Sequence, residues 1–235
     1  MIGLELSTDS VDGAVAADSL GVRRIELCSA GALGGLTPGP GLLAAVRDRV
    51  RTEVHVLIRP REGGFRYTPA EVDVLLADVA HAVSAGAAGV VVGALTDSGD
   101  PDLPVLRDLV AAAGGRELTF HRALDVCRDP VAAVESLVEL GFSRVLSSGQ
   151  AERAEDGIAV LASLVRVADG GLAVMACGGI RPHNARAIVE ATGVRDLHAA
   201  PRRAVPAHES TVEFGGHAEL DVEAARELAR LVREW

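Results

Sequence analysis

The hydrophobic positions of this 235-residue chain fall into eight short apolar runs, and a longer stretch with helical periodicity follows each of them. Strands that alternate with helices predict βαβ units on a parallel sheet. Eight such units predict one domain over residues 1–235, a (β/α)8 TIM barrel, a fold that typically needs ~250 residues. Active sites of this fold lie at the carboxyl ends of the strands. The predicted strands are Ile2–Leu6, Arg24–Cys28, Glu53–Arg59, Gly89–Gly93, Glu117–His121, Arg144–Ser148, Leu172–Cys177 and Arg195–Ala199.

Polar side chains alternate with apolar ones inside several of these runs. The apolar set is expected to face the helices, so the polar set points into the barrel. Buried charge is costly unless it is paired, so we expect one of the two interior glutamates to pair with Arg59 or Arg122. Three interpretations stay open: a polar plug, a site for an anionic or polyhydroxylated small molecule, or a histidine–carboxylate metal site. The predicted interior set is Glu5, Glu26, His55, Arg59, His121 and His198.

Capping residues mark several of the helices between the runs. Thr68, Pro69 and Glu71 form a capping-box pattern, and Asp129-Pro130 is a second helix start. After the eighth strand, Ala204–Glu219 is expected to be a long irregular connection, typical of a lid or a partner-binding segment. The expected helices are Val11–Leu20, Leu42–Val50, Glu71–Ala85, Leu103–Ala113, Val131–Leu140, Ala154–Ala168, His183–Ala191 and Asp221–Glu234.

The charge and composition narrow the function classes. A net charge of −10 argues against binding to nucleic acid or to an anionic membrane, and no apolar run approaches the length of a membrane span. The chain begins directly with a strand, so a cytoplasmic location is the default expectation. All 23 basic residues are arginines, which excludes a barrel aldolase that uses a lysine Schiff base.

Two further segments could carry chemistry at the predicted mouth. Gly178 and Gly179 follow the seventh strand, and Arg202 and Arg203 follow the eighth, where such barrels often bind phosphate. His121 ends the fifth strand within Thr119–Asp125. There, Asp125 is placed either to orient His121 or to pair with Arg122, and a structural role for His121 is an open alternative.

Cysteine supplies a third candidate. Cys28 and Cys177 both end strands, and thiolates suit Cu(I). The two strands are far apart around the predicted ring, whereas two thiols must lie within a few ångströms to share an ion. Cys127 belongs to no metal-binding spacing, and an odd number of cysteines indicates free thiols.

Taken in order, the motifs resemble the CutC family, which is named for copper homeostasis. The resemblance implies a cytoplasmic barrel, commonly a homodimer or larger, with copper handling or copper binding; it implies no reaction. The chain departs from the family pattern at Gly64, at Ala199-Ala200 and at Cys177. The motifs are Glu26-Leu27-Cys28, Gly34–Pro38, Ile58–Arg61, Gly89–Gly93, Thr119–Ala123 with Asp125, Ser147–Gln150 and Gly178–Ile180.

Three functions therefore stand as hypotheses. The first is copper homeostasis, with Cys28 and Cys177 as copper ligands. The second is an enzyme that acts on a phosphorylated or carboxylated small molecule, with His121, Glu26 and Asp125 as catalytic residues. The third is a scaffold whose Ala204–Glu219 loop binds a partner. For the second hypothesis, the expected ligand-binding residues are Glu5, Arg59, Arg61, Arg122, Gln150, Gly178, Gly179, His198 and Arg202.

Overall fold

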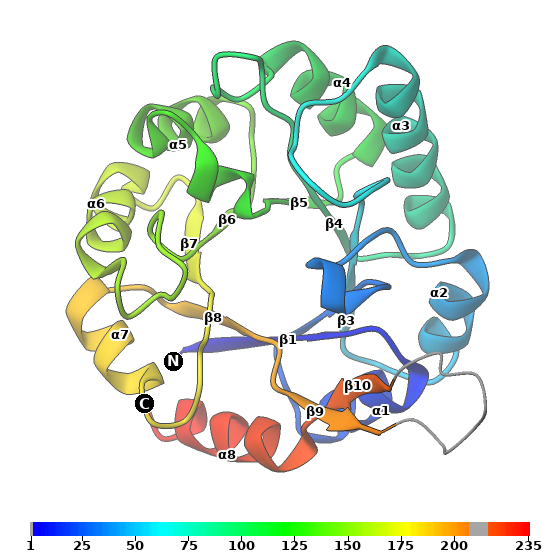
Figure 1. Cartoon of the computed structure of the whole chain (residues 1–235), viewed down its shortest axis with the longest axis vertical. Helices are drawn as coiled ribbons and strands as arrows, with labels where there is room; N and C mark the ends of the chain where they lie inside the picture. Colours follow the sequence, from blue (N-terminus) through cyan, green and yellow to red (C-terminus); the bar gives the residue numbers. More distant parts are fainter. Residues whose placement is uncertain (1, 207–215) are drawn as a thin grey trace.

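Eight parallel strands close into one barrel, in which each strand pairs with the next and β8 pairs with β1 (Figure 1). The computed structural model describes residues 2–206 and 216–235. The predicted (β/α)8 fold is confirmed, because every predicted apolar run overlaps a barrel strand. The strands are β1 (Gly3–Thr8), β2 (Arg24–Leu27), β3 (Glu53–Leu57), β4 (Gly89–Val92), β5 (Glu117–Phe120), β6 (Arg144–Ser147), β7 (Ala173–Ala176) and β8 (Asp196–Ala199).

A ring of helices surrounds the strands (Figure 1). Side-chain caps start several of them: Thr68 and Glu71 form the predicted capping box, and Asp129 accepts hydrogen bonds from the first turn of its helix. The helices are α1 (Val11–Ser19), α2 (Pro40–Arg47), α3 (Pro69–Ser84), α4 (Leu103–Ala113), α5 (Pro130–Glu139), α6 (Ile158–Ala168), α7 (Ala185–Thr192) and α8 (Val222–Arg233), with the short 3-10 turns η1 (Gly31–Leu33) and η2 (Arg122–Val126).

Helix α6 begins four residues later than expected, because the segment before it packs against the end of β6. A Cβ atom on Gly157 would lie 1.9 Å from the carbonyl oxygen of Ser148, so only glycine permits this approach. The backbone N–H of Ala154 donates to the carbonyl of Gly178, across the top of β7, rather than starting a helix. These contacts bring the loops after β6 and β7 together at the mouth.

The apolar faces of the strands pack against the helices, as the alternation predicts. Two small apolar clusters lie inside the barrel, namely Cys28 with Leu57 and Val91, and Leu146 with Met175 and Cys177. The floor of the barrel is charged. The guanidinium of Arg24, which is 1% exposed, donates to Glu5 at 3.0 Å and to Asp196 at 2.8 Å.

The segment after β8 corrects the expectation of an irregular connection over Ala204–Glu219. Its ends form an antiparallel hairpin of β9 (Arg202–Val205) and β10 (His217–Leu220), which lies beside α1 and α8 in Figure 1. An ion pair between Arg203 and Glu219 joins the two strands. These two strands are largely exposed and mix charged with small residues, so they form no apolar run in the sequence. The predicted lid or partner-binding role falls largely on residues 207–215, which lie outside the described residues.

Among the described residues, no helix has both the length and the apolar character that crossing a membrane requires.

Candidate functional site

A cavity of about 270 Å³ opens at the carboxyl ends of the strands, where the fold places active sites. Its volume is near the lower limit for small-molecule sites. Several predicted site residues lie outside its lining: Glu5, Arg61, Asp125 and Gln150. The predicted residues that line it are Glu26, Cys28, Arg59, His121, Arg122, Cys177, Gly178, Gly179, His198 and Arg202.

A carboxylate–imidazole group occupies one side of this cavity. His198 on β8 donates from Nδ1 to Oε1 of Glu5 on β1 at 2.8 Å. Its Nε2 lies 3.9 Å from Oε2 of Glu26 on β2. The expectation that a glutamate would pair with Arg59 or Arg122 is wrong for both glutamates within the described residues. Glu5 pairs with Arg24 and His198, and Glu26 has only His198 within ion-pair distance there. Alternation identifies inward-facing residues, whereas pairing depends on which strands become neighbours when the ring closes.

The electrostatics of these three groups differ because their partners differ. Burial raises the pKa of Glu5. The hydrogen bond and charge of His198 and the charge of Arg24 outweigh this effect and lower the pKa to about 2. Burial raises the pKa of Glu26 above its usual value, and the charge of His198 only partly opposes this. Burial lowers the pKa of His198, yet the two carboxylates outweigh burial and raise it. Glu5 is therefore held as an anion, whereas burial opposes the ionisation of Glu26.

His121 lies on the far side of the cavity, directly after β5. Its Nδ1 accepts a hydrogen bond from the backbone N–H of Ala123 at 3.2 Å. Its Nε2 is buried and has no hydrogen-bond partner among the residues that the structure describes. Burial and then the charge of Arg59 lower the pKa of His121 to about 3. The imidazole is therefore neutral at physiological pH.

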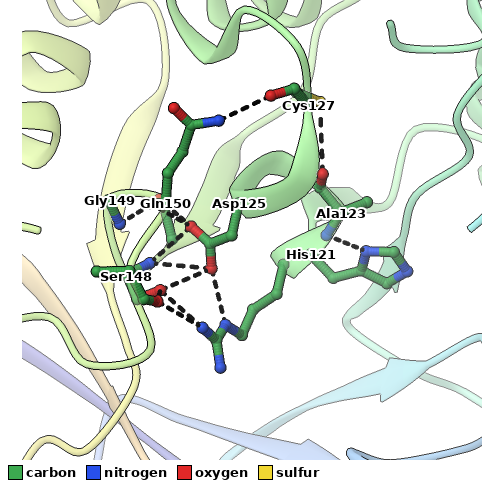
Figure 2. A network of polar contacts seen from close by, with 10 residues as sticks. His121, Ala123, Asp125, Cys127, Ser148, Gly149 and Gln150 are labelled. Atoms are coloured by element: carbon green, nitrogen blue, oxygen red, sulfur yellow. Dashed lines mark hydrogen bonds and ion pairs between the residues drawn. The ribbon is translucent and has the colours of Figure 1, made fainter. Parts of the chain in front are cut away.

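Of the two roles left open for Asp125, the structure shows the pairing with Arg122. Oδ2 of Asp125 accepts from Nε of Arg122 at 2.8 Å, and Oδ1 accepts from the hydroxyl of Ser147 at 2.6 Å. Figure 2 shows the carboxylate of Asp125 facing Ser148, with the ring of His121 turned away from it. Asp125 thus holds Arg122 and the loop after β6, and it does not orient His121.

The arginines of the predicted set have different partners. Arg59 is 8% exposed. Its Nη atoms donate hydrogen bonds to the carbonyls of Leu33, Gly35 and Gly63 at 2.7–3.1 Å. Within residues 2–206 and 216–235 it forms no ion pair. Arg202 pairs with Asp9 at 2.8 Å, and Arg203 points into the hairpin instead of the cavity.

Two predicted residues have structural contacts outside the cavity. Arg61 pairs with Glu71 at the start of α3 and is 40% exposed, which explains its absence from the lining. Gln150 donates to the carbonyl of Cys127 at 2.7 Å and adopts a φ of +59° in the loop after β6. Both side chains therefore shape the loops around the mouth without facing its interior.

The loop after β7, for which the sequence predicts anion binding, contains two glycines in an unusual backbone conformation. Gly178 and Gly179 have φ of +87° and +75°, a left-handed conformation that favours glycine. Within the described chain their backbone N–H groups donate no hydrogen bond. Asn184 fixes this loop by accepting from the N–H of Arg181 at 2.8 Å and donating to the carbonyl of Gly179 at 2.9 Å.

Cys28 and Cys177 both line the cavity and are both buried, with exposures of 2% and 1%. Burial and the charge of Glu26 raise the pKa of Cys28 to about 12, and burial also raises the pKa of Cys177. Neither thiol therefore has the low pKa typical of reactive cysteines. A different potential ligand set, Glu5, Glu26 and His198, has ligand atoms within 4.8 Å of one another. Both oxygens of Glu5 already accept hydrogen bonds from Arg24 and His198, however.

Sequence reasoning missed three contributors to the site. Arg24 shares the inward face of β2 with Glu26 and Cys28, so the alternation contained the signal for it. Arg181 lines the cavity two residues after the glycine pair, and no spacing rule marks it. Asn184 also lacked a signal, because its role depends on the loop conformation.

Comparison with known proteins agrees with the fold. The sequence profile of the CutC family matches residues 2–202. A CutC protein of Xanthomonas campestris is 42% identical over 99% of both chains, and one of Bacteroides thetaiotaomicron is 40% identical over 92% of this chain and 89% of that protein. A crystal structure of a CutC protein from Streptococcus agalactiae, named for copper homeostasis, superposes with a TM-score of 0.80. It is 31% identical and covers 84% of this chain and 98% of its own.

Proposed function

We propose that this chain, which belongs to the CutC family, binds an anionic small molecule at the mouth of its barrel and transfers a proton to or from it. The ligand class is a phosphorylated or carboxylated compound small enough for a cavity of about 270 Å³. Residues from opposite sides of the barrel line this cavity, so they can act on one bound molecule.

The observation that carries this proposal is the buried guanidinium of Arg59. Burying a charge is costly unless an opposite charge compensates it. The hydrogen bonds of Arg59 go to neutral backbone carbonyls, and in the described part of the chain no carboxylate pairs with it. Arg181 also lines the cavity without an ion-pair partner in those ranges. An anionic ligand would supply the missing negative charge.

The proton-transfer part of the proposal rests on Glu26. Its carboxyl is 6% exposed, faces the cavity, and has a pKa raised chiefly by burial. A general acid or base works best when its pKa lies near the operating pH. His198, held by Glu5, places a positive charge beside Glu26 and so keeps the carboxylate form accessible.

Titration calorimetry with inorganic phosphate as the probe tests the anion site. We expect saturable binding that weakens as ionic strength rises, and a loss of affinity of about tenfold in both Arg59→Gln and Arg181→Gln. The matched control is Arg203→Gln, because Arg203 follows Arg202 in sequence but pairs with Glu219 outside the cavity. Equal affinity in all four proteins, or no binding to any, would contradict the proposal.

We also propose Cu(I) as a second ligand, because the thiols of Cys28 and Cys177 line the same cavity. Soft thiolates fit Cu(I) better than the carboxylates of Glu5 and Glu26 do. The raised pKa of both thiols sets a condition: Cu(I) must displace thiol protons, so binding should strengthen as pH rises.

Competition against a chromogenic Cu(I) chelator at several pH values tests this second proposal. We expect one equivalent of Cu(I) per chain and loss of binding in Cys28→Ser and in Cys177→Ser. Cys127→Ser is the matched control, since Cys127 is buried outside the cavity and donates to the carbonyl of Ala123. Full retention of binding in the Cys28→Ser, Cys177→Ser double variant would exclude thiol ligation.

Family membership further supports a cytoplasmic homodimer as the working form. Sedimentation of the purified chain at micromolar concentration tests the dimer, and fractionation of the source cells tests the location. A monomer, or recovery outside the cytoplasm, would contradict these two proposals.

A further inference from the structure

We infer, resting on the function proposed above, that His121 donates a hydrogen bond from Nε2 to an oxygen of the bound molecule. The sequence left open whether His121 is a proton-transfer residue or a structural one. Its contacts assign proton transfer to Glu26 and leave His121 as a fixed donor. The bound molecule is then an anion with a carbonyl group next to a carbon that carries a removable proton.

The tautomer of His121 follows from a single backbone contact. A neutral imidazole carries its proton on one nitrogen and accepts with the other. The N–H of Ala123 points at Nδ1 with an N···N distance of 3.2 Å, so Nδ1 must be the acceptor. Nε2 therefore carries the proton. A second proton on Nδ1 would set two donors against each other, which is unfavourable in a buried site.

The nitrogen without a hydrogen-bond partner within the described residues, Nε2, belongs to a ring that lines the cavity. His121 is 5% exposed and lines the cavity, and Nε2 finds no hydrogen-bond partner in the described ranges. Leaving a buried donor unpaired costs roughly 1–3 kcal/mol. In Figure 2 the ring contacts Ala123 through one nitrogen only. A ligand oxygen would satisfy this donor.

Close packing around the ring favours one orientation, in which Nδ1 lies next to the N–H of Ala123. A Cβ atom on Gly93, which follows β4, would lie 2.4 Å from Cε1 of His121 and 2.5 Å from its Nδ1. The ring of Phe65 covers His121 with 4.7 Å between centroids, and the guanidinium of Arg59 lies 5.2 Å from the centre of Phe65. The space that Gly93 leaves open is thus filled by an imidazole in one orientation.

The position of His121 relative to Glu26 indicates which reaction the two residues could carry out on a molecule bound between them. In the closed order of strands β5 is four places from β1, and β2 and β8 flank β1 (Figure 1). His121, directly after β5, therefore lies across the barrel from the strands that carry Glu26 and His198. Glu26 would remove a proton from the carbon next to the carbonyl. The C–H electron pair then forms a C=C bond, and the carbonyl π electrons move to the oxygen held by His121. Return of the proton to carbon restores the carbonyl, so no other reactant is needed.

A neutral imidazole suits this task because it donates to the developing oxyanion without needing to lose its proton. An imidazolium next to Arg59 would add a second buried positive charge. A protonated histidine would also be a stronger acid and would transfer its proton to the enolate. The geometry of His121 therefore supports stabilisation of an enolate rather than protonation of it.

Nitrogen-15 NMR of histidine-labelled protein tests the assigned tautomer without any ligand. We expect the His121 signals, identified by their loss in His121→Gln, to show a protonated Nε2 and an unprotonated Nδ1 between pH 5 and 8. The exposed His81 provides a reference within the same sample. A proton on Nδ1 of His121, or a doubly protonated ring within that pH range, would overturn the inference.

Binding selectivity tests the assigned ligand class and separates it from the anion site itself. Inorganic phosphate and phosphoglycolohydroxamate, a phosphorylated mimic of an enolate, serve as the two probes. We expect His121→Leu to weaken the hydroxamate about tenfold and phosphate less than about twofold, and His121→Gln to restore part of the difference. Equal weakening of both probes, or of neither, overturns the role of His121. Failure of both probes to bind the unmodified protein overturns the anion site instead.

Discussion

His198 and Glu5, which are 193 residues apart in the sequence, share a hydrogen bond of 2.8 Å between an imidazole Nδ1 and a carboxylate Oε1. The bond exists because β8 closes the barrel against β1, with Glu5 opposite His198 in the register. The second oxygen of Glu5 accepts from Arg24 at 3.0 Å. Closure of the barrel and the charge state of the cavity are thus linked through one buried carboxylate.

Replacement of this carboxylate should be strongly destabilising. In Glu5→Gln the guanidinium of Arg24 keeps Asp196 as its one anionic partner in the described part of the chain, and His198 loses its hydrogen-bonded anion. Removing one member of a buried ion pair typically costs about 3–5 kcal/mol. We expect a loss of about 3 kcal/mol in the free energy of unfolding at pH 7, measured by urea titration. A loss below about 1 kcal/mol would show that Arg24 is satisfied without Glu5.

The same carboxylate predicts a pH dependence. The pKa of Glu5 is about 2 in the folded chain, against an ordinary value of 4.5. Burial raises this pKa, but the effects of His198 and Arg24 together outweigh burial and lower it. A carboxyl with a lowered folded pKa stabilises the fold above its unfolded pKa, and that contribution is lost as pH falls from about 4.5 toward 2. Urea titrations across this range should show a weaker decline for Glu5→Gln than for the unmodified protein. Parallel declines would contradict the lowered pKa.

One substitution, glycine to alanine, should have opposite effects at two positions. A Cβ atom on Gly89 would lie 2.5 Å from Cε1 of buried His55 and 2.7 Å from the backbone oxygen of Glu117. Gly89→Ala should therefore lose about 1–3 kcal/mol of stability through overpacking. Gly41 is an exposed residue within α2 with open space around it, so Gly41→Ala should gain about 0.5–1 kcal/mol. Thermal unfolding of the two variants checks both signs.

The carboxylate of Asp125 should control ligand affinity through Arg122. Its oxygens accept from Arg122, from Ser147 and from the N–H of Ser148 (Figure 2). In Asp125→Asn the charge that holds the guanidinium is lost, and the amide cannot accept from all of these donors. We expect phosphate to bind several-fold more weakly while His121 keeps its tautomer. A coupled change in the His121 NMR signals would show that the two residues interact more directly than the structure indicates.

The buried thiols should be unreactive in the folded chain. Burial raises the pKa of Cys28 and of Cys127 to about 12, so the thiolate fraction at pH 8 is very small. We expect iodoacetamide to label all three cysteines slowly in native buffer and rapidly in urea, as followed by intact mass. Rapid labelling of Cys28 in native buffer would contradict the burial of its thiol.

Much of this site was predictable from the alternation of residues along each strand and from the repeated order of strands and helices. Alternation along the strands identified Glu5, Glu26, His121 and His198 as inward-facing, and the order of elements placed their strand ends at one mouth. Arg24 was accessible to the same reasoning, since it shares a face with Glu26. The loop residues Arg181 and Asn184 were not, because loops lack a repeating geometry that relates sequence position to direction.

The sequence by itself determined the closed eight-stranded barrel, the inward set of polar residues and the mouth where they gather, since these depend on local periodicity and chain order. Only the tertiary structure decided which charges meet, because pairing depends on register and ring closure between distant segments. It joined Glu5 to Arg24 and His198, joined Asp125 to Arg122, and left Arg59 without an anionic partner among the described residues. It also set the proton of His121 on Nε2, through one backbone N–H two residues away.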